Sequence, residues 1–308
     1  MVIEHDKMRS LAARMAQPEV RGRSPWADAR RRFLRNKAAM AGLVILLLVA
    51  LFAIFGNHLA VWSNEELDFS VMGQVATMGQ PSLENGHYFG TDDLGRDLFA
   101  RTVQGTQVSL LVGLVGAGIA VIVGTLYGAV AGYVGGRTDQ VMMRTVDILM
   151  SIPYMFVLIL LLVMFGRSMT MLFLGIGLIS WLDMARIVRG QTLSLKNREF
   201  IEAARATGVS TWRIIIRHIV PNLLGVVAVY ATLLVPLMIL TESFISFLGL
   251  GVQEPLTSWG ALISEGAGTM SYGTLWQLAF PLFFFVITLF GFFFVGDGLR
   301  DALDPKER

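Results

Sequence analysis

Six long apolar stretches, separated by polar segments, dominate this 308-residue sequence. An α-helix needs roughly 20 apolar residues to cross about 30 Å of hydrocarbon, and the stretches are near that length. The alternating pattern of a membrane β-barrel is absent, so the expected class is an all-α integral membrane protein with six transmembrane helices. The predicted spans are residues 38–61, 108–134, 150–165, 169–184, 223–250 and 275–295.

The composition supports this class. Hydrophobic residues make up 54% of the chain, charged residues 16%, and the mean hydropathy is +0.61, whereas soluble proteins average about 25% charged residues. The chain has no cysteine, which excludes disulfides and thiolate metal sites, and its four histidines show no paired metal-ligand spacing. We therefore predict that this chain itself binds no metal and no cofactor.

Lysine and arginine residues are distributed unevenly between the polar segments. If the N-terminus is cytoplasmic, 22 of the 25 lie in cytoplasmic segments, and only Arg96, Arg101 and Arg167 lie outside. The positive-inside rule then predicts that both termini are cytoplasmic. The basic arm before the first apolar stretch favours a retained helix over a cleaved signal peptide. Its basic run at 30–37 is interpreted as a lipid-headgroup anchor, so no nucleic-acid partner is expected.

The sequence contains no nucleotide-binding motif. The segment nearest to a phosphate loop, residues 132–138, lacks the lysine and the spacing of GxxxxGK[ST], and it ends a predicted span instead of following a strand. Any ATP must therefore be bound by a partner.

The 37-residue segment 186–222, between the fourth and fifth spans, is basic and highly patterned. We expect residues 193–206 to continue the fourth span as a helix, Gly208 to form a turn, and Ser210 to cap a second helix that Pro221 ends. Apolar residues recur in that second helix at helical spacing: Trp212, Ile215, Ile216 and Ile219. The pattern alone fits both a docking surface and an amphipathic helix pair lying on the bilayer.

Within this segment, the order Glu-Ala-Ala, then glycine, then proline resembles the EAA loop of permease subunits in ABC importers. The resemblance implies that the loop seats in a cleft of an ATPase subunit. The residues to which it assigns ATPase coupling are Glu202, Ala203, Ala204, Arg205, Gly208, Trp212 and Pro221. His218 occupies a position where the family usually has isoleucine, so no contact is assigned to it.

Other runs resemble the C-type permeases of the oligopeptide and dipeptide importers, over nearly the whole chain from Arg30 onward. These runs are GTDDLGRD at 90–97, FLGLG at 247–251, SWG at 258–260 and GDGLRDALDP at 296–305. Two further runs, HYF at 87–89 and WLDMARIVRGQ at 181–191, are most similar to the oligopeptide members. The resemblance therefore favours oligopeptides over dipeptides, nickel complexes or other small cargo.

The family resemblance also implies an architecture and a set of partners. The expected fold is that of a type I ABC importer permease, which forms half of an ATP-driven pathway by alternating access and is not itself an enzyme. The implied partners are a homologous second permease, two ATPase subunits that bind ATP and Mg²⁺, a peptide-binding protein outside the membrane, the peptide, and lipid. The implied location is the bacterial inner membrane.

The expected domain organisation follows the spans. It consists of a cytoplasmic arm (1–37), a first transmembrane helix (38–61), a periplasmic loop (62–107), a permease core with five transmembrane helices (108–298) that contains the coupling loop (186–222), and a cytoplasmic tail (299–308).

Glycines recur every four residues along the second predicted span, at Gly124, Gly128, Gly132 and Gly136. Such a stripe of small residues lets another helix approach closely. The sequence leaves open whether the resulting seam is static or moves during transport.

Several charged residues lie in or near the spans. Glu242 is expected close to the outer mouth, where a carboxylate reaching water is favoured over one lining the peptide entrance. Asp183 is expected to pair with Arg186, three residues along the same helix. The outer segments are acidic, which suits a binding-protein surface, although the positive-inside rule alone predicts much of this imbalance. No residue of the substrate path can be assigned from the sequence.

Three other membrane classes are weaker alternatives. A channel requires a ring of filter groups, and a membrane protease requires a Ser/His or paired Asp constellation; the sequence indicates neither. A membrane scaffold could share the spans, but it has no need of a loop hinged by glycine and ended by proline.

Overall fold

The computed structural model describes residues 25–303, and within that range the chain is helical apart from loops and two isolated β-bridges. Residues 1–24 of the predicted arm and 304–308 of the predicted tail lie outside the described residues. Five of the described helices are long and apolar enough to cross a membrane, or six spans result if the bent pair α6 (Gly136–Ser151) and α7 (Tyr154–Phe165) counts as one. The predicted all-α membrane class is confirmed.

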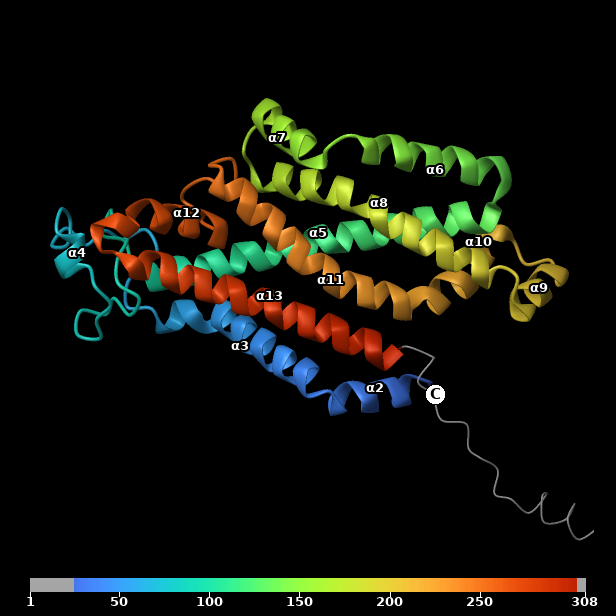
Figure 1. The fold of residues 1–308 in the computed structure, drawn as a ribbon, viewed down its shortest axis with the longest axis horizontal. Coiled ribbons are helices and arrows are strands. Elements are labelled where there is room, and N and C mark those ends of the chain that lie inside the picture. Colours follow the sequence, from blue (N-terminus) through green and yellow to red (C-terminus); the bar gives the residue numbers. More distant parts are fainter. Residues whose placement is uncertain (1–24, 304–308) are drawn as a thin grey trace, which may run out of the picture.

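The long helices lie side by side in an elongated bundle (Figure 1). Three of them form its centre, and α5 packs along both of the others: α5 (Leu98–Val134), α8 (Met169–Leu195) and α11 (Val220–Phe247). On one side of the bundle α2 (Pro25–Arg35) leads into α3 (Lys37–Leu59), which packs against α13 (Leu275–Leu303). On the other side, α6 and α7 lie over α8.

The two ends of the bundle carry different short elements (Figure 1). At one end, called here the α12 end, are α4 (Val75–Met78), α12 (Trp259–Thr269) and the 3₁₀ turn η2 (Met270–Tyr272). At the opposite end, called the α9 end, are α9 (Glu199–Ala206), α10 (Thr211–Ile214) and the π turn η1 (Ile215–Ile219), which leads directly into α11.

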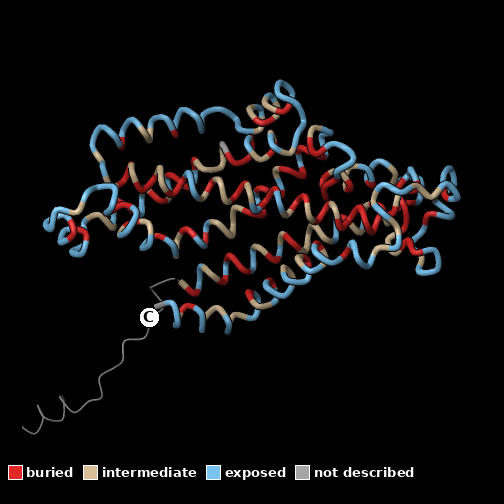
Figure 2. Tube along the Cα trace, turned by 180° about the vertical axis from the view of Figure 1, so that it is seen from behind, coloured by how far each residue is buried: buried red, intermediate tan, exposed pale blue. Residues whose placement is uncertain are grey.

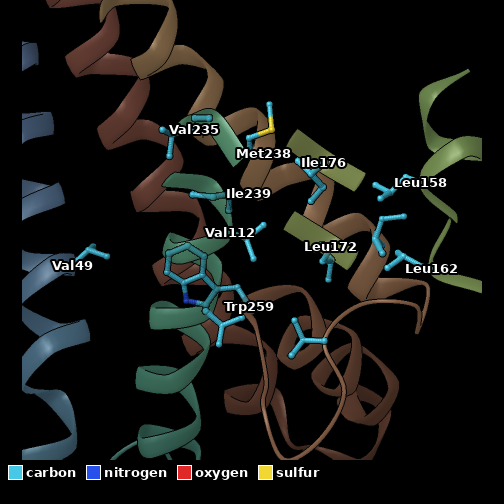
Figure 3. Close-up of a cluster of buried hydrophobic side chains, with 14 residues drawn as sticks. Val49, Val112, Leu158, Leu162, Leu172, Ile176, Val235, Met238, Ile239 and Trp259 are labelled. Carbon is cyan, nitrogen blue, oxygen red and sulfur yellow. The ribbon is translucent and has the colours of Figure 1, made fainter. Parts of the chain in front are cut away.

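Buried residues concentrate in the central helices, whereas α6 and the outer faces of α3 and α13 are largely exposed (Figure 2). One cluster of buried side chains joins α7 and α8, through Leu158 and Leu172, to the centre of the bundle, where Ile239 and Trp259 lie (Figure 3). A second cluster lies at the α9 end. Since α5, α8 and α11 contribute to both clusters, these three helices form the frame on which the rest of the molecule is built.

Polar side chains fix where several of these helices begin. Each accepts a hydrogen bond from a backbone N–H in the first turn, which no helix carbonyl can reach. The caps are Asn36 before α3, Asp97 before α5, Ser168 before α8 and Ser258 before α12.

The structure corrects the third predicted span, residues 150–165. Two helices occupy this region, because α6 and α7 meet at an angle of 76°. Pro153 has no N–H to donate and disfavours helical geometry in the residue before it, and Ile152 is accordingly extended, with a ψ of 125°. The apolar run therefore covers α7 and only the last residues of α6.

The predicted helix bounds near the polar segments also need correction. The second span was expected to begin at residue 108, but α5 begins at Leu98. Its first turns include polar residues that are fully buried: the Thr102 hydroxyl donates to the carbonyl of Leu98, and the Thr106 hydroxyl to that of Thr102. Tertiary packing thus extends the helix well beyond its apolar run.

Candidate functional site

The segment between α8 and α11 folds as two helical pieces joined at Gly208. The expected continuous helix over 193–206 is wrong, because α8 ends at Leu195 and α9 begins anew at Glu199. After α9, the N–H of Gly208 donates to the carbonyl of Arg205, and the N–H of Val209 to that of Ala204. This is the Schellman pattern of a helix C-terminus.

Gly208 supplies the turn as the sequence predicted. Its φ is +77°, a left-handed conformation that costs other residues about 1–2 kcal/mol. No heavy atom lies within 4 Å of where a Cβ would stand, so the backbone angle, not crowding, explains the preference for glycine here.

One face of α9 is anchored to the bundle and the other is free. Ile201 is fully buried and Ala204 is 9% exposed, and both pack in the cluster that includes Met184 and Val188 of α8. Glu202 and Ala203 are exposed. Ile201 and Ala204 therefore anchor α9 on the bundle, and α9 projects at the end of the bundle (Figure 1).

Arg205 lies at the edge of this exposed surface. Its guanidinium carbon is 5.6 Å from the centroid of the Tyr133 ring, which belongs to α5. This cation–π contact, worth about 0.5–1 kcal/mol at an exposed site, links α9 to the end of α5.

The second helical piece divides its apolar residues between two faces. Ile215 and Ile219 are buried in the same cluster, but Trp212 is 58% exposed and Ile216 is 38% exposed. Of the four apolar residues at helical spacing, two therefore pack on the bundle and two lie outward. Both add apolar area to the exposed surface at this end of the molecule.

Pro221 does not end a helix, in contrast to the prediction. The chain from Thr211 to Phe247 forms one continuous helix of 37 residues, and Pro221 occupies its exposed side just after η1. Proline removes one helical hydrogen bond, and the helix accommodates this loss with the wide π turn immediately before it.

The glycine stripe forms a close contact between α5 and α8. A Cβ at Gly124, Gly128 or Gly132 would stand 2.3–2.7 Å from atoms of α8. Gly136, the fourth predicted member, instead begins α6, and a Cβ there would meet nothing within 4 Å. The seam therefore has three glycines.

Two ion pairs tie α6 to α8, and neither is the pair predicted from the sequence. Arg186 donates to Asp147 at 2.5 Å, and Arg189 donates two bonds of 2.6 Å to Asp139. The Asp183–Arg186 pair is not formed. Asp183 makes no hydrogen bond or ion pair with any residue in the described part of the chain, and it faces a cavity.

Charged residues of the GTDDLGRD run, residues 90–97, form an ion network at the α12 end. Asp92 accepts from Arg96 at 2.6 Å and from Arg101 at 2.5 Å. Each arginine also reaches a second carboxylate, Glu254 from Arg96 and Glu265 from Arg101, both at 2.7 Å. The hydrogen bond and charge of Arg96 lower the pKa of Glu254. Part of the acidic excess predicted for the outer loops is therefore neutralised within the chain.

Glu242 does not reach water, and this expectation is wrong. Its carboxylate is fully buried and accepts hydrogen bonds from Ser109, Ser243 and Ser246, at 3.2, 3.3 and 2.6 Å. The backbone N–H of Trp259 donates in turn to the Ser109 hydroxyl. The cluster thus joins α5, α11 and α12 through polar groups that satisfy one another.

Sequence reasoning missed the Glu242 cluster and the two ion pairs of α6. The two ion pairs and the Ser109–Glu242 bond join different helices, so no local spacing indicates them; only Ser243 and Ser246 lie on the helix of Glu242. The one available signal was a carboxylate within a long apolar stretch, which applies to both Asp183 and Glu242. Within residues 25–303, no group of three or more His, Asp or Glu side chains is arranged to hold a metal ion.

A bundle of apolar helices with one broken span, an ion network at one end and an anchored, hinged helix at the other is the architecture of a multi-span membrane protein. The chain belongs to the family of binding-protein-dependent transport system inner membrane components, whose family model matches residues 124–308. A second family model, the N-terminal TM domain of oligopeptide transport permease C, matches residues 24–74. The family resemblance stated from the sequence is confirmed, and the chain is a transport subunit, not an enzyme.

Similar proteins align over almost the whole chain. The oligopeptide transport system permease protein OppC of Escherichia coli K12 is 59% identical over 290 residues, covering 94% of each chain. The protein of the same name from Haemophilus influenzae is 54% identical over 98% of this chain and 96% of its own. The dipeptide transport system permease protein DppC of Bacillus subtilis is 45% identical over 91% of this chain and 86% of its own.

Proposed function

We propose that this chain is the permease subunit of an ATP-driven oligopeptide importer and that it docks an ATPase subunit through α9. The observation that best supports docking is that α9 is anchored to the bundle by Ile201 and Ala204 and exposes Glu202 and Ala203. A helix fixed in this way transmits a push on its outer face to α5 and α8. Relatives that are 54–59% identical to this chain are named oligopeptide permeases, which supports an oligopeptide as the cargo.

The docking surface is the exposed side of the segment on both sides of Gly208. It comprises Glu202, Ala203, Arg205, Gly208, Trp212 and Pro221, with Ala204 beneath it. Switching a transporter from a 1:99 to a 99:1 population ratio of its two states requires an interaction that favours one state over the other by about 5.5 kcal/mol. A single interface hot spot contributes roughly 2–4 kcal/mol, so several of these residues must act together.

The proposed assembly contains this chain, a homologous second permease, two ATPase subunits that bind ATP and Mg²⁺, and a peptide-binding protein outside the membrane. The proposed location is the bacterial inner membrane, with both termini and the α9 end cytoplasmic. In this orientation the 1–37 arm, the coupling loop 186–222 and the 299–308 tail are cytoplasmic, and the loop 62–107 is periplasmic. The 22 lysine and arginine residues on the cytoplasmic side support this orientation.

A dipeptide importer is the second candidate. The dipeptide permease of Bacillus subtilis, at 45% identity, supports keeping it. Uptake of labelled peptides of two to six residues by membranes containing the assembled complex distinguishes the two, because the preferred length should exceed two residues for the first candidate.

The docking proposal is tested by pull-down from native membranes in mild detergent, comparing wild type with Glu202→Arg. Wild type should recover ATPases and a sister permease, and Glu202→Arg should lose the ATPases alone. Glu84→Arg, a charge reversal at another exposed residue, at the α12 end, serves as the control and should recover both.

Two results would contradict the proposal. If wild type recovers no ATPase under conditions that preserve other membrane complexes, the segment is not a docking surface. If Glu202→Arg also loses the sister permease or fails to insert, Glu202 has a structural role instead.

A further inference from the structure

A cavity of about 770 Å³ opens where α6 and α7 bend away from α8. Its walls come from the bend itself, from α8 and from α11, and most of the lining is apolar, including Met150, Met155 and Met238. Methionine side chains adapt to differently shaped neighbours, so this lining suits an occupant of variable shape.

Asp183 is the only charged side chain in the cavity lining that the structure describes. The nearest arginines along α8 are already engaged, since Arg186 pairs with Asp147 and Arg189 with Asp139. A carboxylate inside a membrane span without a partner is costly, and such groups mark ligand or ion pathways. Asp183 is exposed to the cavity and has no partner in the described part of the chain, so its carboxylate is free to bind a cation that enters the cavity.

The depth of Asp183 follows from its neighbours. The Ser180 hydroxyl contacts the sulfur of Met238 at 3.3 Å, and α8 and α11 run in opposite directions (Figure 1). Asp183, three residues after Ser180, therefore lies level with about residue 235, near the middle of α11, and Leu234 does line the cavity. The carboxylate thus lies in the middle part of α8, one helical turn before Arg186, at the α9-end side of the apolar run 169–184.

The other polar groups of the cavity present hydrogen-bond acceptors. The Ser180 hydroxyl donates to the carbonyl of Ile176 and the Thr241 hydroxyl to that of Leu237, so the oxygens of both keep free lone pairs. The Tyr154 hydroxyl lies 3.4 Å from the Thr241 hydroxyl. Ser180 and Asp183 are three apart and share one face of α8.

A carboxylate with hydroxyl acceptors in an otherwise apolar cavity matches an ammonium group, which carries three donors and a positive charge. Every unmodified peptide has such a group at its N-terminus, next to a side chain that varies. We propose that Asp183 binds the α-ammonium group of the peptide during passage, with Ser180, one helical turn away on the same face of α8, as a supporting acceptor. This inference rests on the proposed peptide-importer function and adds to it a contact within the membrane.

The test uses the complete transporter in liposomes, with its binding protein, and a peptide without lysine or arginine whose α-ammonium is its only cation. Uptake of the free peptide is compared with uptake of its N-acetylated form at equal occupancy of the binding protein. Wild type should favour the free peptide about tenfold or more, and Asp183→Asn should reduce this ratio towards one. Asp297→Asn, an exposed carboxylate of α13 outside the cavity, should keep the wild-type ratio.

A second measurement identifies the occupant directly. A photoreactive benzoylphenylalanine in place of Leu237, which lines the cavity, should cross-link to labelled peptide during ATP turnover in the complete complex. Asp183→Asn should reduce that cross-link about tenfold. Cross-linking to the sister permease or to lipid alone would overturn the proposal, as would an unchanged uptake ratio in Asp183→Asn.

Failure of this inference can be distinguished from failure of the proposed function. If wild type takes up no peptide while the complex is assembled and hydrolyses ATP, the importer function is wrong and the subsite falls with it. If wild type imports peptide but Asp183→Asn shows the same preference for the free amine, only the subsite is wrong. Loss of the sister permease from Asp183→Asn would instead make Asp183 an interface residue.

Discussion

His87 lies fully buried between two carboxylates in the loop at the α12 end. Its Nδ1 is 2.9 Å from Asp97, which also caps α5, and its Nε2 is 3.4 Å from Asp68. The ring stacks on Trp62 at a centroid distance of 4.7 Å. An imidazolium ring can donate to both carboxylates at once, whereas a neutral ring can donate to only one.

The charge state of His87 should therefore set the stability of this loop. Burial alone would lower the pKa of His87, but the hydrogen bonds and charges of Asp97 and Asp68 outweigh it and raise the pKa above the usual 6.5. A raised folded-state pKa means that the stabilisation is fully present below about pH 6.5 and is lost as pH rises through the folded-state value. Protease cleavage within residues 62–97 should thus accelerate as pH rises from 6 to 9.

Two variants check this prediction. At low pH the protease should cleave His87→Gln faster than wild type, and the cleavage rate should lose most of its pH dependence. His58→Gln, which changes an exposed histidine at the end of α3, should be cleaved as wild type is. An unchanged pH profile in His87→Gln would show that another group titrates.

The packing of α5 on α8 depends on the absence of side chains at the glycine seam. A Cβ at Gly128 would stand 2.3 Å from the carbonyl oxygen of Ala185 and 2.9 Å from the Arg189 nitrogen, and both atoms are backbone and cannot rotate away. We expect Gly128→Ala to destabilise the protein by about 1–3 kcal/mol, as overpacking typically does. The midpoint of thermal unfolding in detergent measures the effect.

Gly118 provides the matched control on the same helix. No atom lies within 4 Å of its Cβ position, so Gly118→Ala should be neutral or stabilising by about 0.5–1 kcal/mol through helix propensity. Equal unfolding midpoints for the two variants would contradict the view that α5 and α8 need backbone contact.

At the scale of elements, the sequence predicts the existence of the helices better than their ends. Long apolar runs identify five spans, because each run is close to the length that a helix needs. The start of α5 at Leu98 was missed, since Thr102 and Thr106 read as polar until their hydroxyls are seen to bond within the helix. Pro153 itself indicated the bend, because proline disfavours helical geometry in the residue before it. The apolar residues on both sides of it nevertheless suggested one unbroken span.

The candidate site was predictable only where it is local in sequence. The turn at Gly208 follows from the residue type, and the structure agrees. The Ser109–Glu242 bond joins residues 133 apart in the sequence, and no spacing within one helix encodes it. The cavity around Asp183 is likewise formed by several helices.

Considered whole, the molecule carries an ion network at its α12 end that joins three segments of the chain. Arg101, only 3% exposed, joins Asp92 of the preceding loop to Glu265 of α12. Arg101→Met would leave these carboxylates without that partner, and breaking a buried ion pair typically costs about 3–5 kcal/mol. We expect a lower unfolding midpoint together with faster protease cleavage near residues 250–258.

Glu265→Gln is the companion variant. Because the Glu265 side chain is 44% exposed, its pair with Arg101 is screened by solvent, and the substitution should cost about 1 kcal/mol or less. A cost for Arg101→Met no greater than that for Glu265→Gln would show that the Asp92 contact contributes little.

If the continuous helix from Thr211 to Phe247 moves as one body, with Pro236 in its interior, it is a lever. At 1.5 Å per residue, its 37 residues span about 55 Å. One tip carries Trp212 at the α9 end, the central part supplies the Leu234 and Leu237 wall of the cavity, and the far part holds Glu242 against α5 and α12. If the lever tilts as a unit by about 5°, one tip moves by about 5 Å relative to the other. A displacement at the tip that carries Trp212 would therefore change the width of the cavity without any rearrangement inside the helix itself.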